Sequence, residues 1–414
     1  MMLKTYKPIL FLMALLVAAS PVLAQDTIAA QDNTSCSKNL KLLNIDLGIS
    51  KHDVNIAMND LHTSLKEGVS ALNSNLHVWI PELKELNNNI SMSVNDAVSD
   101  DMVTSGNVSE KVKNYSKSYP MDANDKLNIS NKYGNIVVKT WNKNEAKVDI
   151  EIKSYASNDA IAQKMIDAIS ISDNKSGDAI SFSTNFGGGN NGSVWDLFNN
   201  RNDNHKAEVN YTIYMPTKNA LNIRNRYGST ELPDFDGMVT IDCAYGNVEA
   251  KSLVNGDNHI DVKYGNASID GLGSADVNVK YGNLELGSAD KLNFSIGNGA
   301  ARIGRIKTSA NINARYAGGV QIDNLDKNFK SFSYSASYSN IKIGIDNATN
   351  ANFDVTVRYG GFDYGGVPIE ITEKTPSDDS KGWKPTKNFK GHINKANPDR
   401  MINISSSYGA VKFE

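Results

Sequence analysis

The sequence predicts an all-β protein: a single-stranded parallel β-solenoid of about 19 residues per coil, preceded by a short helical region. The prediction rests on a phrase that recurs across residues 221–364, in which apolar and polar residues alternate on both sides of Tyr-Gly-Asn. Clear copies lie at residues 262–269 and 279–286. Alternation with period two is typical of strands, and a regular repeat of about 20 residues is typical of solenoids.

The copies can be aligned on their tyrosine position. They then fall at Tyr227, Tyr245, Tyr264, Tyr281, Ile296, Tyr316, Tyr338 and Tyr359, with an early copy at Tyr133 and a last copy at Tyr408. The apolar parity changes across Gly-Asn, so both flanking strands keep their apolar side chains inside while the chain turns a corner. By this parity we expect the tyrosine column to point inward and pack in the core.

The corner residues are assigned a structural role, because Gly and Asn tolerate the positive φ that a sharp turn demands. Stacked asparagines such as Asn266 and Asn283 are expected to bridge neighbouring coils through their amides. An antiparallel hairpin at Gly-Asn is the alternative, and the recurrence of identical residue types at identical positions favours stacking. The assigned corners are Tyr227, Gly228, Tyr245, Gly246, Asn247, Tyr264, Gly265, Asn266, Tyr281, Gly282 and Asn283.

The N-terminal part predicts export. Residues 1–24 read as a signal peptide, with Lys4 and Lys7, an apolar core at 9–19 and a small-residue cleavage site at 22–24. A membrane anchor is the weaker interpretation, because the apolar run is short for a bilayer. With no transmembrane segment expected after signal removal, we expect an extracytoplasmic location: periplasm, cell surface or secreted.

Residues 25–50 are polar and are predicted to be a linker. Residues 51–98 carry a helical periodicity, with Leu61, Leu65 and Val69 among its apolar positions. Two interpretations stay open for this region: a helical hairpin or coiled coil that oligomerises or docks on the body, and a partly ordered spacer. Residues 99–122 are predicted to be a second linker.

Residues 123–414 form the predicted solenoid domain. Ser157 is expected to cap a short helix, and this helix and the excursion at 365–400 are the expected caps of the stack. The loop at 185–205 holds Trp195 and Phe198, a candidate contact site. Cys243 occupies an inward position and is expected to be a buried small hydrophobe rather than a disulfide partner of Cys36.

Charge and motifs limit the functional classes. The formal net charge of −3 argues against a nucleic-acid partner. The histidines lack zinc-site spacing and no catalytic motif is present, so the sequence predicts no catalytic residue, metal or cofactor. The position before the tyrosine is often basic and is a candidate stripe for a polyanionic glycan or an anionic lipid head group; a solvated face that discourages sheet association is the simpler interpretation. That stripe consists of Arg226, Lys263, Lys280, Arg315 and Arg358.

The Tyr-Gly-Asn corners, the Tyr214-Met215-Pro216 lead-in and the final Ser407-Tyr408-Gly409 strand resemble a family of secreted bacterial proteins. These are the β-helical "putative adhesin" domains found in Bacteroidetes-type genomes, which are otherwise domains of unknown function. The resemblance covers residues 125–414. It implies a β-solenoid outside the cytoplasm with an adhesion or envelope role, and it supplies no binding residues.

The sequence thus favours a secreted non-enzymatic β-solenoid, an adhesin or an envelope structural or binding protein whose partner is a glycan or an envelope protein. One alternative is a polysaccharide-acting enzyme, by analogy with other β-helices. Another is a periplasmic signalling accessory that engages a partner, or forms an oligomer, through residues 51–98.

Overall fold

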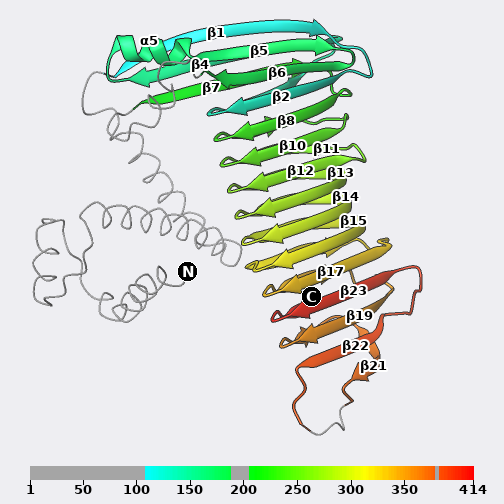
Figure 1. Cartoon of the computed structure of the whole chain (residues 1–414). Coiled ribbons are helices and arrows are strands. Elements are labelled where there is room, and N and C mark those ends of the chain that lie inside the picture. The colour runs from blue at the N-terminus through cyan, green and yellow to red at the C-terminus, as the bar shows by residue number, and fades with distance from the viewer. Residues whose placement is uncertain (1–107, 188–204, 378–381) are drawn as a thin grey trace, which may run out of the picture. The chain divides into compact units, whose positions relative to one another are not determined.

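The computed structural model describes residues 108–187, 205–377 and 382–414. Within these ranges the chain is nearly all β, with 24 strands in one large sheet and a single helix (Figure 1). The predicted signal peptide, the linker at 25–50, the helical region at 51–98 and the pair Trp195 and Phe198 lie outside the described residues. No helix in the described ranges is long and apolar enough to cross a membrane.

The helix and the strands follow one another along the chain. In order they are β1 (Ser109–Pro120), β2 (Lys126–Lys132), β3 (Ile136–Thr140), β4 (Glu145–Ala156), α5 (Asp159–Asp167), β5 (Ile169–Ser176), β6 (Ala179–Phe186), β7 (Lys206–Met215), β8 (Ala220–Arg226), β9 (Thr230–Leu232), β10 (Val239–Ala244), β11 (Val248–Leu253), β12 (Asn258–Lys263), β13 (Ala267–Lys280), β14 (Leu284–Gly297), β15 (Ala300–Arg315), β16 (Gly319–Leu325), β17 (Ser331–Ser337), β18 (Ile341–Ile345), β19 (Ala351–Arg358), β20 (Phe362–Asp363), β21 (Ile369–Thr375), β22 (Thr386–Ile393), β23 (Met401–Ser407) and β24 (Val411–Phe413).

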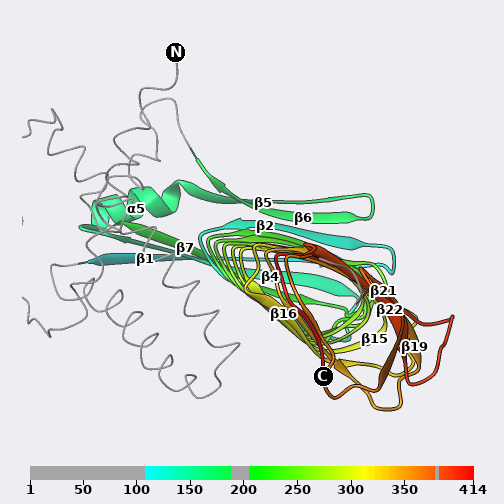
Figure 2. The same cartoon turned by 90° about the horizontal axis from the view of Figure 1, so that it is seen from below.

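Two parallel ladders run through the sheet. One passes from β2 through β8, β10 and β12 to the C-terminal halves of β13, β14 and β15 and on to β17. The other passes from β3 through β9 and β11 to the N-terminal halves of the same long strands, then to β16 and β18. Figure 2 looks along the stack, where successive turns of the chain lie over one another.

The copies of the repeat pair in register, and alternate side chains of both ladders enter one core. Val262 pairs with Val279 and Lys263 with Lys280, both in parallel, so the predicted parallel alignment of these two copies is confirmed. Val262 and Val279 are fully buried, and Cys243 at the equivalent position is also fully buried, as expected. Burial raises the pKa of the Cys243 thiol to about 11.

The prediction that the tyrosine column points inward is wrong. The tyrosines from Tyr227 onward are 41–64% exposed, and the corner tyrosines themselves adopt positive φ, for example 56° at Tyr264 and 57° at Tyr281. The parity change therefore occurs at the tyrosine, whose left-handed backbone turns its side chain out of the strand alternation. Corner glycines have another role: a Cβ on Gly282 would lie 1.8 Å from the carbonyl oxygen of Gly265.

The left-handed backbone of Asn298 corrects the alignment of one copy. Ile296 is buried and pairs with Val279, two positions before the corner, and Asn298 takes the tyrosine position with φ 56°. Asparagine tolerates this left-handed conformation better than most non-glycine residues. The copy therefore turns at Asn298-Gly299 and lacks a ring.

The N-terminal end of the sheet differs from the prediction in two ways. Part of the predicted linker at 99–122 is strand β1, which pairs antiparallel with β4 along its whole length. As an exposed edge strand it has a polar sequence, which is why it resembled a linker. The helix α5 is capped by Asn158, whose side chain accepts a hydrogen bond from the Ile161 backbone N–H at 3.0 Å, and not by Ser157.

The C-terminal end is assembled out of sequence order. Strand β23 lies between β17 and β19, parallel to both (Figure 1). Strand β24 lies between β18 and β20, also in parallel. The excursion at 365–400 contains the antiparallel pair β21 and β22, and β22 adds to β19. The excursion therefore extends the sheet beyond β19.

Candidate functional site

Two exposed features of the repeat can contact a ligand, and the first is the tyrosine ladder. Adjacent rings lie 4.7–5.2 Å apart, centroid to centroid, with interplanar angles of 2–11°. Ring faces inside the ladder are covered by their neighbours, which leaves ring edges and hydroxyl groups for other contacts. In their order along the sheet, its members are Tyr133, Tyr227, Tyr245, Tyr264, Tyr281, Tyr316, Tyr338, Tyr408 and Tyr359.

The ladder has one interruption, which we call the ladder gap: the space over Asn298, between Tyr281 and Tyr316. Lys280 pairs with Gly297 and Gly297 with Arg315, so the three corners are consecutive in the sheet. Tyr281 is 53% exposed and Tyr316 is 64% exposed, more than the other exposed members of the ladder. One face of each ring has no ladder ring against it.

The predicted basic stripe is only partly available. Arg226 forms an ion pair with Asp242 at 2.7 Å, and Lys263 with Asp261 at 3.1 Å. The Arg226 guanidinium also holds the pKa of Asp242 below its usual value. Arg358 lies 5.4 Å from the centroid of the Tyr359 ring.

Lys280 and Arg315 are the two members of the stripe that flank the ladder gap. Both are exposed, and neither forms an ion pair within the described ranges. The stripe is discontinuous in space, because Ala244 separates Arg226 from Lys263 and Gly297 separates Lys280 from Arg315. Of the five basic residues of the predicted stripe, two therefore lie beside the ladder gap.

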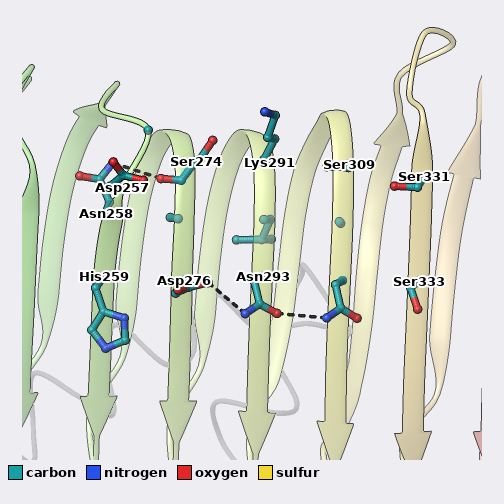
Figure 3. Close-up of a pocket in the computed structure, with 15 residues that line it drawn as sticks. Asp257, Asn258, His259, Ser274, Asp276, Lys291, Asn293, Ser309, Ser331 and Ser333 are labelled. Atoms are coloured by element: carbon teal, nitrogen blue, oxygen red, sulfur yellow. Dashed lines mark hydrogen bonds between the residues drawn. The ribbon is translucent and has the colours of Figure 1, made fainter.

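The second feature is the polar groove, a shallow cavity of about 550 Å³ on β12, β13, β14, β15 and β17. One outward residue from each strand forms a row across it, and Figure 3 shows these side chains on neighbouring strands. The Asn293 amide donates to Asp276 at 2.9 Å, and the Asn311 amide donates to Asn293 at 3.2 Å. The row consists of His259, Asp276, Asn293, Asn311 and Ser333.

One end of the groove is fixed by a buried amide. Asn258 is 2% exposed; its amide donates to the backbone oxygens of Leu253 and Asn255, and its side-chain oxygen accepts from the Val239 N–H. These bonds hold the turn that carries Asp257 against the first strand of the groove. Charge in the groove is mixed, because Asp257 and Asp276 line it together with Lys291.

Chemically, the groove offers hydroxyl, amide and carboxylate groups at the spacing of neighbouring strands. Such groups can pair with the hydroxyl groups of a polar ligand. No cluster of His, Cys, Asp and Glu suited to a metal ion is present in the described part of the chain.

Sequence reasoning missed the polar row because Ile296 was aligned with the tyrosines. Counting five residues back from Ile296 gives Lys291, whereas counting back from Asn298 gives Asn293, in line with Asp276 and Asn311. The corrected corner thus provides the signal that would have found the row.

The corner asparagines bridge neighbouring copies as predicted, although Asn247, Asn266 and Asn283 do not adopt the positive φ that was expected of them. Asn247 accepts a hydrogen bond from the backbone N–H of Asn266, and Asn266 accepts one from Asn283, both at 2.9 Å. Asn283 in turn accepts from Ala300 at 2.9 Å. The predicted bridging of neighbouring copies by these amides is confirmed.

No protein-family model matches the chain, and no curated protein sequence does either. Solved structures with detectable likeness include a "putative cell adhesion protein" from Clostridium sporogenes, which is 12% identical over 73% of this chain and 99% of that chain with a TM-score of 0.18. A "putative adhesin" from Parabacteroides distasonis is 8% identical over 73% and 97%, with a TM-score of 0.35. A "putative lipid binding protein" from the same species is 9% identical over 73% and 96%, with a TM-score of 0.32.

Proposed function

We propose that this chain is an extracytoplasmic, non-enzymatic β-solenoid that binds carbohydrate through its polar groove, as an adhesin or an envelope binding protein. The observation that carries the proposal is the row of hydrogen-bonding side chains from Asp276 to Ser333, placed on consecutive parallel strands. The signal-like segment at 1–24 supports export, and the parallel stacking of consecutive copies supports the solenoid.

A polymeric ligand suits this row better than a compact one. Parallel strands repeat at about 4.8 Å, so the row presents a polar group at each such interval on a rigid support. A chain of sugars offers hydroxyl groups at regular intervals and can satisfy successive strands. The mixed charge of Asp257, Asp276 and Lys291 favours a ligand without net charge.

Binding is a better use of these residues than cleavage. Asp276 accepts the Asn293 amide, and Asn293 accepts the Asn311 amide, so the polar row is engaged in a hydrogen-bonded series. A glycosidase needs one carboxyl group as an acid and a second one as a base or nucleophile. The series instead holds the amides in fixed orientations for recognition.

A glycan array of neutral oligosaccharides, probed with the full mature chain, tests the proposal. Asn293→Ala/Asn311→Ala removes two amides, and at about 0.5–1.5 kcal/mol each we expect affinity to fall about fivefold or more. Asn174→Ala, an exposed asparagine on β5, is the matched control and should bind like the wild type.

Equal binding by the double variant and the wild type would remove the groove as the binding site. Release of shorter fragments from any bound polysaccharide would overturn the non-enzymatic part of the proposal.

A further inference from the structure

We infer that the ladder gap is a second binding site, which takes one acidic sugar ring, a hexuronate residue of an acidic polysaccharide, between Tyr281 and Tyr316. This site is separate from the polar groove and uses different residues. The inference rests on the room in the gap, on a glycine that packing does not require, and on the charges beside it.

The gap has the size of one ring. Tyr264 and Tyr281 are one strand apart with centroids at 4.9 Å, and Tyr316 and Tyr338 are one strand apart at 5.2 Å. Tyr281 and Tyr316 are two strands apart, which corresponds to about 10 Å. A ring midway would lie about 5 Å from each, within the usual range for stacked rings.

A glycine, Gly297, lies at the floor of the ladder gap, and packing does not require a glycine at this position. A Cβ on Gly299 would lie 1.7 Å from the Gly282 carbonyl oxygen, so that corner glycine is required by packing. At Gly297 the nearest atom would be the Arg315 carbonyl oxygen at 4.0 Å, and its φ is not in the left-handed region. Packing would therefore admit a side chain at Gly297, whose absence keeps the space between Lys280 and Arg315 clear.

The charge beside the gap is positive and is not neutralised by ion pairs of the described residues. Lys280 and Arg315 lie on either side of Gly297, whereas Arg226 and Lys263 of the same stripe are paired with aspartates. A carboxylate above Gly297 would meet an ammonium and a guanidinium group, and guanidinium can bind a carboxylate through two hydrogen bonds.

These three features select a uronic acid over neutral sugars and over planar aromatic rings. The C–H faces of a pyranose stack on tyrosine rings, its hydroxyl groups can pair with the exposed Asn298 amide, and its carboxylate matches Lys280 and Arg315. A neutral sugar would leave both cations without a partner. An aromatic side chain of another protein would leave the Asn298 amide without a hydrogen-bond partner.

The test is calorimetric titration of the full mature chain with trigalacturonate. In Asn298→Tyr the gap is filled by the residue that occupies the equivalent position in the nine ladder members, and the φ of 56° at Asn298 lies within the 52–62° of those tyrosines. We expect this variant to fold with an unchanged or raised melting temperature and to lose trigalacturonate affinity at least about tenfold.

A second variant, Lys280→Gln/Arg315→Gln, leaves the gap open and removes only surface charge. We expect a loss of about tenfold and a weaker dependence of affinity on salt. Asn293→Ala/Asn311→Ala in the polar groove should keep wild-type affinity for trigalacturonate, so failure of the groove and failure of the gap are distinguishable.

Wild-type affinity in Asn298→Tyr, or absence of wild-type binding, would overturn the inference. Equal affinity for neutral galactotriose would overturn the assigned role of the two cations. Tighter binding of 4-hydroxyphenylacetate than of trigalacturonate would replace the sugar by an aromatic occupant.

Discussion

Gly282→Ala tests the close stacking of corners. Its Cβ would lie 1.8 Å from the Gly265 carbonyl oxygen, and the contact is with backbone, which cannot rotate away. Relief requires the two corners to separate locally by more than 1 Å, because ordinary contacts of this kind are about 3.4 Å. The substitution therefore acts on the bonds between the two copies.

The cost can be worked from the hydrogen bonds that flank this contact. Tyr264 donates to Lys280, Ala267 donates to Asn283, and Asn283 donates to the Asn266 side chain, each at 2.9 Å. A separation of more than about 1 Å would stretch all three beyond the range of a hydrogen bond. At about 0.5–1.5 kcal/mol each, the expected loss of unfolding free energy is about 1.5–4.5 kcal/mol.

Urea unfolding of the full chain, followed by circular dichroism, measures this loss. The matched control is Gly361→Ala, since Gly361 also lies at a corner but a Cβ there meets nothing within 4 Å. We expect the control to change the unfolding free energy by less than about 0.5 kcal/mol. Equal midpoints for the two variants would refute the stacking argument.

Three further substitutions act on single buried or bridging groups. Asn266→Ala removes the acceptor of the Asn283 N–H and should cost about 0.5–1.5 kcal/mol in urea unfolding. Cys243→Val should abolish a loss of stability between pH 9.0 and about 11, because burial raises the thiol pKa and the unfolded chain releases its proton first. Asp125→Asn should destabilise the chain at neutral pH and lose this effect as the pH falls below 3.8, since the hydrogen bond from Lys175 at 2.7 Å lowers the carboxyl pKa.

Each of these three predictions has an outcome that would contradict it. An Asn266→Ala variant as stable as the wild type would mean that water replaces the amide at no cost. Parallel stability curves for wild type and Cys243→Val above pH 9.0 would exclude a role for thiol ionisation. A constant difference for Asp125→Asn down to the most acid pH would mean that lost packing, and not lost charge, explains the effect.

The stacking of the copies could be predicted because equivalent positions of the repeat carry the same residue types. Val262 and Val279, and Asn266 and Asn283, are identical residues at identical places, and in-register parallel pairing puts such residues side by side. The amide bridge follows from the same argument. No feature of the pairing in this region required knowledge of distant parts of the chain.

The direction of the tyrosines could not be obtained by the same counting. Strand alternation assumes extended backbone at each residue, and a left-handed residue such as Tyr281 reverses it. Tyrosine is uncommon in the left-handed conformation, so the change in side-chain direction was predicted at Gly-Asn. The same assumption misplaced the corner at Asn298. An apolar residue was expected at the tyrosine position, so Ile296 was aligned there in place of Asn298.

The two ends of the sheet depend on pairing between segments that are distant in sequence. Strand β1 pairs with β4 through an antiparallel backbone ladder, and the hydroxyl groups of Tyr115 and Tyr119 on β1 both donate to Asp173 of β5. Such contacts leave no local periodicity to detect. Likewise, the sequence of β23 does not indicate which two copies of the repeat it will lie between.

The position of β23 and β24 has a consequence for biogenesis. A chain is synthesised from its N-terminus, and segments that emerge early begin to fold first. Because β23 separates β17 from β19, the join between them cannot close until the last residues have been delivered. A prematurely terminated product would present two open strand edges, which chaperones and proteases can recognise, so the topology itself distinguishes finished molecules from fragments.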